Sequence, residues 1–119
     1  MKRPEIFLDH ILECINEIEK NTKNISKEIF FENTTIQDAV IRRLEIIGEA
    51  VKNLPKSFKS RYPKIPWKSV AGMRDVLIHE YFGVDLRLIW KIVDKELPAF
   101  KKEILKLLNE QKNYNQKLV

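Results

Sequence analysis

The chain has 119 residues, of which 44% are hydrophobic and 33% are charged, a balance that is ordinary for one globular domain. Only 3 glycines are present and no Val/Ile/Thr run alternates with polar residues, which argues against a sheet-rich fold and favours an all-α one. The single cysteine excludes an internal disulfide, and no apolar run approaches the length of a membrane span. We therefore expect a cytoplasmic protein that does not contact membranes.

The first half of the chain predicts two long helices. The first spans about residues 4–27 and has an apolar stripe that includes Cys14, which we expect to be buried. Asp9, His10 and Glu13 interrupt any signal-peptide pattern, so secretion is not expected. Thr35 and Asp38 resemble a capping box that starts the second helix. Gly48 inside that helix costs about 1 kcal/mol relative to alanine, so close packing by a neighbouring helix should compensate.

The second half begins with an irregular connection, residues 54–66, which contains three prolines. A third helix is expected over residues 66–81, and Asp85 can cap a fourth. The apolar stripe of the fourth helix keeps its phase through Pro98, which predicts a kink or short break followed by a fifth helical piece. Residues 109–119 are polar and should fray. The whole chain, 1–119, is expected to form a single domain, an up-and-down bundle of four or five helices.

The positive charge is concentrated in one segment. Residues 50–74 contain seven cations and no acidic residue, so the rest of the chain holds 15 basic and 17 acidic residues. Aromatic side chains alternate with these cations, a pattern that is moderately specific for nucleic acid because cations hold phosphates and rings stack on bases. A basic surface loop with buried aromatic anchors fits nearly as well. The candidate RNA-binding residues are Lys56, Lys59, Arg61, Lys64 and Lys68.

Arg74 follows this segment and falls within the apolar face of the third expected helix. Burial of an unpaired guanidinium would be very costly. One interpretation is a structural ion pair, with Glu45 or Glu49 as partner, or a side chain that extends to solvent. The other is an arginine that binds phosphate and lines a cleft.

His79 is one of only two histidines and can carry a proton near neutral pH. It lies five residues after Arg74, roughly 140° around an ideal helix. The helix is therefore distorted, or the two groups line a cleft from its sides, or a second subunit completes the site. Asp75 precedes His79 by one turn and could orient the imidazole. A lone histidine is, however, more often a surface or satisfied core residue, and Tyr81 on the apolar side would usually belong to the core.

Other chemistries have less support. One cysteine and two histidines far apart in sequence do not suit a zinc site, and no glycine-rich phosphate loop or Gly-x-Ser-x-Gly motif is present. We therefore expect neither a metal nor another cofactor.

The segment Arg74, four residues, His79, one residue, Tyr81 resembles the motif of the HEPN superfamily, specifically its HepT-like branch of toxins. Matching flanks are Ile47-Gly48-Glu49-Ala50, Pro66-Trp67, Gly72-Met73, Val84-Asp85 and Trp90, and the likeness covers most of residues 5–108. Asp75 departs from the asparagine that this branch often has, which puts its orienting contact in question.

The resemblance implies a helical bundle that dimerises through the motif helix and forms a composite cleft. It implies a metal-independent endoribonuclease toxin and a minimal nucleotidyltransferase as antitoxin, which neutralises the toxin by adding AMP to the tyrosine, Tyr81 here. A larger hetero-oligomer of toxin and antitoxin is a further option.

Residue chemistry is compatible with this activity. RNA supplies its own nucleophile, the 2′-hydroxyl, so Arg74 would stabilise the phosphate and His79 would act as general base or acid, with Asp75 orienting a partner. An alternative is a non-catalytic helical module that associates with a nucleotidyltransferase and helps to bind nucleotide or substrate. A plain dimeric scaffold is the third option.

Overall fold

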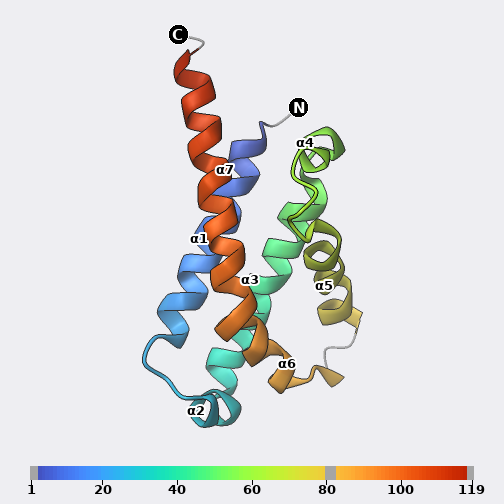
Figure 1. The fold of residues 1–119 in the computed structure, drawn as a ribbon. Coiled ribbons are helices and arrows are strands. Elements are labelled where there is room, and N and C mark those ends of the chain that lie inside the picture. Colours follow the sequence, from blue (N-terminus) through green and yellow to red (C-terminus); the bar gives the residue numbers. More distant parts are fainter. Residues whose placement is uncertain (1–2, 80–82, 118–119) are drawn as a thin grey trace.

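The computed structural model describes residues 3–79 and 83–117, with the backbone alone at 78–79 and 115–117. Its helices are α1 (Pro4–Thr22), α2 (Lys27–Glu32), α3 (Thr34–Asn53), α4 (Lys56–Ser60), α5 (Trp67–His79), α6 (Leu86–Lys91) and α7 (Leu97–Lys117), with a π-helical turn at Ile92–Glu96. No strand occurs in the described part, and the long helices alternate in direction along the bundle (Figure 1). The expected all-α up-and-down bundle is confirmed.

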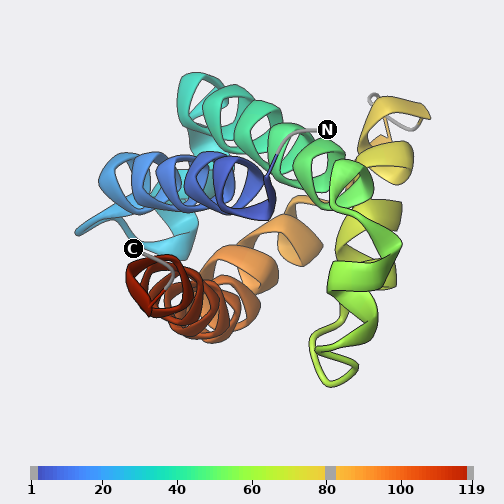
Figure 2. The same cartoon turned by 90° about the horizontal axis from the view of Figure 1, so that it is seen from above.

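Helix α1 lies between α3 and α7, and α5 packs on the far side of α3 (Figure 2). The predicted apolar stripes meet in one core, whose fully buried side chains include Ile11, Leu44, Val51, Ile89 and Ile104. The cysteine of α1, Cys14, is only 2% exposed, as expected, and burial raises the pKa of its thiol. An ion pair from Lys101 to Glu19 (2.5 Å) adds a polar contact between α7 and α1. The described residues include no helix that is both long and apolar enough to span a membrane.

Two helix boundaries differ from expectation, each because of the local conformation or a local hydrogen bond. The first helix ends at Thr22 rather than near residue 27, and Asn24 adopts a positive φ of 62°, a conformation that a regular helix cannot include. Asn33, not Thr35, caps α3: its Oδ1 accepts a hydrogen bond from the amide of Ile36 (3.0 Å). The predicted capping box is therefore wrong by two residues.

The connection between α3 and α5 also differs, because it contains the short helix α4. Phe58 of α4 is buried, so five residues that look like an irregular basic loop fold onto the core. Helix α5 then begins at Trp67, one residue after the predicted start at Pro66. The expected helix end at residue 81 lies outside the described residues.

The predicted break near Pro98 takes the form of the π-helical turn. The amide of Leu97 bonds to the carbonyl of Ile92, five residues back, and α7 follows with Pro98 in its first turn. A wider turn suits this position because proline has no N–H and its ring crowds the carbonyl four residues earlier. Asp85 caps α6, as predicted, by accepting from the amide of Arg87 (2.9 Å). Residues 109–117 are helical here, and fraying of this end stays a prediction.

Candidate active site

Gly48 sets the position of Arg74. A Cβ added at Gly48 would lie 2.7 Å from the Cβ of Arg74 and 3.1 Å from the carbonyl oxygen of Val70. Helices α3 and α5 therefore approach so closely that only glycine fits between them. The expectation that a neighbouring helix packs against Gly48 is confirmed, and the neighbour is the helix that carries Arg74.

Arg74 makes two ion pairs. Its Nε lies 2.5 Å from Oε2 of Glu49, and its Nη1 donates to Oδ1 of Asp75 at 3.1 Å. Glu49 Oε1 in turn accepts from Nδ2 of Asn53 (3.4 Å). The ion pair of one interpretation is therefore present, with Glu49 rather than Glu45 as partner. The side chain of Arg74 is still 29% exposed, so the pair does not bury it completely.

The apolar face predicted for this helix is confirmed where it is described. Trp67 and Leu77 are buried, Val70 and Met73 are half-buried, and the pattern reaches the last described turn. His79 is the last residue of α5, but its side chain is outside the described part, and so is Tyr81. The relation of the imidazole to Arg74, the orienting role of Asp75 and the role of Tyr81 stay predictions.

A groove rich in lysine lies beside the motif helix, between α3, α4 and α5. Its volume is about 580 Å³, and Asp75 of α5 lies at its edge. The cations that line it are Lys52, Lys56, Lys59 and Lys68. Four cations and one carboxylate leave this lysine groove with a formal charge of +3, which favours a polyanion. Three of the five predicted RNA-binding residues thus lie together, and Lys52 joins them.

Lys59 also stabilises the end of α3. Its Nζ donates to the carbonyl oxygen of Val51 (3.1 Å), one of the last carbonyls of that helix. Partial burial, followed by repulsion from Lys56, lowers the pKa of this ammonium. Lys59 therefore stabilises the end of α3 as well as contributing charge to the lysine groove.

The other two predicted RNA-binding residues do not line the lysine groove. The guanidinium of Arg61 lies over the rings of Phe58 and Tyr62, 5.3 Å and 5.9 Å from their centres. Lys64 is exposed in the turn before α5. Their sequence spacing could not show this, because α4 turns the segment away from α5.

The aromatic residues of this segment are anchors rather than exposed stacking platforms. Phe58 is 2% and Trp67 is 7% exposed, and Trp67 packs edge-on against Phe100. Tyr62 is half-buried and donates its hydroxyl to Glu110 (2.9 Å); burial and this bond raise its pKa. Of the two interpretations of the basic-aromatic pattern, buried anchors are correct for the rings.

A second cleft, of about 340 Å³, lies between α1 and α3 and reaches Arg74 from its other side. His10 of α1 is one of its lining residues. Sequence reasoning missed this residue as a site candidate, because 64 positions separate it from Arg74 and no motif connects them. Within the described residues, no three His, Cys, Asp or Glu side chains gather as metal ligands would.

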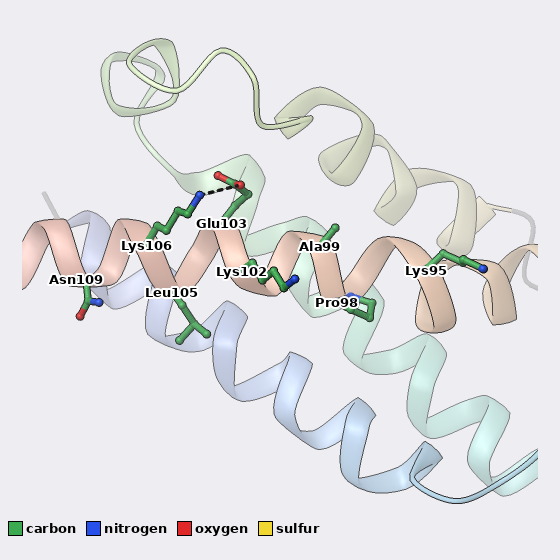
Figure 3. Close-up of a pocket in the computed structure, with 8 residues that line it drawn as sticks. All are labelled: Lys95, Pro98, Ala99, Lys102, Glu103, Leu105, Lys106 and Asn109. Carbon is green, nitrogen blue, oxygen red and sulfur yellow. Dashed lines mark ion pairs between the residues drawn. The ribbon is translucent and has the colours of Figure 1, made fainter.

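A third hollow, of about 630 Å³, lies away from α5 on the outer face of α7. Figure 3 shows that its side chains come from α7 and the π-helical turn before it, and that Lys106 pairs with Glu103 (3.7 Å). The lining residues line up along one helix and do not converge on a point, so we assign it no chemistry.

Comparison with known proteins agrees with the motif. The model of a family described as ribonuclease HepT-like matches residues 11–107. A Caldanaerobacter subterraneus protein named "Putative RNase" is 48% identical over 112 residues, which cover 94% of this chain and 100% of that protein. A Thermococcus cleftensis protein named "Probable ribonuclease HepT" is 50% identical over 101 residues, covering 85% of this chain and 92% of that one.

A longer relative extends the comparison. The Methanocaldococcus jannaschii protein named "Gamma-glutamylcyclotransferase and putative RNase" is 55% identical over 117 residues, covering 98% of this chain but only 53% of its own length. No solved structure matches the chain at a comparable level. The family match, the helical bundle and the Arg74 motif agree: the chain belongs to the HepT-like ribonuclease family.

Proposed function

We propose that this protein is a metal-independent endoribonuclease that cleaves RNA by attack of the 2′-hydroxyl on the adjacent phosphate. One observation carries the proposal: Arg74, partly exposed and fixed by two carboxylates, lies next to Asp75 at the edge of the lysine groove. An RNA backbone held by the lysines would pass beside a guanidinium that is already oriented.

The reaction requires only proton transfer and charge stabilisation. The 2′-oxygen forms a bond to phosphorus as the bond from phosphorus to the 5′-oxygen breaks, which gives a 2′,3′-cyclic phosphate and a 5′-hydroxyl. His79 takes the proton of the 2′-hydroxyl or gives one to the leaving oxygen, a role typically worth about 10²–10⁴-fold. Arg74 binds the phosphate and its transition-state charge. Asp75 orients Arg74, which it already contacts, or the imidazole.

The active unit is a dimer that pairs the two motif helices. Helix α5 packs mainly against α3, and Val76 on its outer surface is 50% exposed. Leu88 of α6, the next helix, is 48% exposed and is a second large apolar side chain that a partner chain could cover. A two-fold axis here would bring Arg74 of one chain near His79 of the other, which is one of the arrangements that the angle between these residues on the helix allows.

Cellular control comes from a nucleotidyltransferase antitoxin that adds AMP to Tyr81. This tyrosine lies two residues after His79, so a nucleotide attached there would place a bulky anion where the RNA phosphate binds. Incubation with the partner and ATP, followed by mass spectrometry, tests this step. Modification confined to other residues would contradict it.

RNA digestion in EDTA tests the central proposal. The purified protein should cut RNA and leave cyclic phosphate ends, and Arg74→Ala and His79→Ala should each reduce the rate at least 100-fold. Leu105→Ala, a change at an exposed position on α7, is the matched control and should cut normally. Unimpaired cutting by a folded His79→Ala variant would refute the mechanism.

A second candidate function is a non-catalytic module that helps a nucleotidyltransferase to bind nucleotide or substrate. The two ion pairs of Arg74 favour it, because a purely structural arginine would make such contacts. Growth arrest on expression, relieved by Arg74→Ala, would support the nuclease. Unimpaired growth, together with RNA left intact in EDTA, would support the module.

A further inference from the structure

Apolar and polar side chains both line the cleft between α1 and α3. The apolar ones are Ile6, Phe7, Ile46 and Ala50, and the polar ones, called the rim here, are His10, Arg42, Glu45, Glu49, Asn53 and Arg74. Its volume of about 340 Å³ lies at the small end of the range for ligand pockets, so one ring system with part of a sugar would fill it.

The charges on this rim cancel. Glu45 pairs with Arg42 at 3.4 Å, and Glu49 pairs with Arg74 at 2.5 Å, so two cations face two anions. Apart from the edge of Arg74 that the scissile phosphate would occupy, the cleft offers a phosphate no excess of positive charge, whereas the lysine groove offers an excess of three. The cleft therefore suits a neutral, flat group that has hydrogen-bonding edges, and a nucleobase has these properties.

The two cavities adjoin consecutive residues of one helix. Arg74 lines the cleft and Asp75 lines the lysine groove, so the two cavities adjoin the motif helix at neighbouring positions. A strand of RNA whose phosphates follow the lysines would bring a base beside the scissile phosphate to the mouth of the cleft.

We infer that the α1–α3 cleft is a nucleobase subsite for a nucleotide that flanks the cleaved phosphate, with His10 and the phenyl ring of Phe7 as its stacking surfaces. This inference rests on the proposed ribonuclease function. Stacking is sequence-tolerant, and the amide of Asn53 together with the rim carboxylates supplies the edge contacts that would discriminate between bases. His10 is thus a specificity residue and takes no part in proton transfer.

Binding can be measured without catalysis, by NMR titration of the protein with each of the four nucleoside 5′-monophosphates. Ribose 5-phosphate, which has the sugar and the anion but no base, is the control ligand. We expect the nucleotides, and not the control, to shift the backbone amides of His10 and Ile46. His10→Ala should weaken nucleotide binding about tenfold, and Asn16→Ala, an exposed change on the same helix but outside the cleft, should not. Equal shifts with ribose 5-phosphate, or unchanged affinity in His10→Ala, would overturn the inference.

Cleavage assays then separate this inference from the function on which it rests. With RNA substrates that vary the base on each side of the cut, His10→Ala should raise KM more than it lowers kcat and should reduce the base preference. The pH profile of kcat should not change, which distinguishes stacking from proton transfer. Failure of the wild-type protein to cut any RNA would refute the ribonuclease proposal, and the NMR titration would still decide whether the cleft binds a base.

Discussion

Gly48→Ala is the substitution that tests most directly how the fold positions Arg74. The added Cβ would lie 2.7 Å from the Cβ of Arg74, and ordinary contacts begin at 3.4 Å, so α5 must move by about 0.7 Å. The obstacle on the α5 side is backbone and Cβ, which cannot turn away as the end of a flexible side chain could. The helix itself must therefore shift.

Two free-energy terms oppose each other in this variant. Replacing glycine by alanine inside a helix gains about 1 kcal/mol in propensity. Overpacking at a tight contact typically costs about 1–3 kcal/mol. We expect a net loss in the free energy of unfolding of up to about 2 kcal/mol, measured by urea denaturation. Cleavage should suffer more, because a displacement near 1 Å of a positioned group can cost about 10²-fold.

Gly72→Ala is the matched control on the other helix. No atom outside its own helix backbone lies within 4 Å of a Cβ built there, so the propensity gain should appear alone and stabilise the protein by about 0.5–1 kcal/mol. If Gly48→Ala were stabilising by the same amount and cut RNA at the normal rate, the close contact would not be what positions Arg74.

Three further predictions follow from individual contacts. Lys56→Glu should weaken RNA binding and reduce the slope of log affinity against log salt by about 0.7 or more, whereas Lys112→Glu, on the exposed surface of α7, should change neither. Tyr62→Phe should cost about 0.5–1.5 kcal/mol. The pKa of Tyr62 is raised in the folded state, so its contribution to the free energy of unfolding is complete below the ordinary value of 10.0 and is lost as pH rises through the folded pKa. Urea denaturation should therefore show a smaller difference in unfolding free energy between wild type and Tyr62→Phe in that pH range. Glu49→Gln should lower the free energy of unfolding by less than about 1 kcal/mol, since both side chains of the Arg74–Glu49 pair are partly exposed. It should still reduce kcat at least tenfold, because Arg74 loses its fixed orientation. Faster RNA cleavage by this variant would mean that Glu49 restrains Arg74 instead.

Features that depend on helix periodicity could be predicted from the sequence. The apolar stripes, the buried Cys14, the cap at Asp85 and the irregularity before Pro98 all follow from residues within one or two turns of each other. Gly48 belongs with them, because a glycine in a helix interior requires a compensating contact wherever the partner comes from.

Two helix boundaries could not be predicted because they depend on local alternatives that periodicity does not separate. Helix α1 ends before Asn24, which has a positive φ, and Asn33 rather than Thr35 caps α3.

Features that depend on which helices meet could not be predicted either. His10 reaches the candidate site only because α1 packs along α3, and Arg61 leaves it only because α4 redirects the chain. These outcomes are set by tertiary packing, which a single sequence read by periodicity does not contain.

Arg74 can form structural ion pairs and also bind phosphate, the two roles that its place in the sequence allowed. An arginine has five N–H donors in one plane. Within the described residues, Nε lies 2.5 Å from Oε2 of Glu49 in an ion pair, and one N–H of Nη1 donates to Asp75. That use leaves both N–H groups of Nη2 and one of Nη1, and these two nitrogens form an edge that matches two oxygens of a phosphate. The ion pairs and the proposed phosphate contact therefore do not exclude each other, because the carboxylates fix the orientation in which the remaining edge is presented.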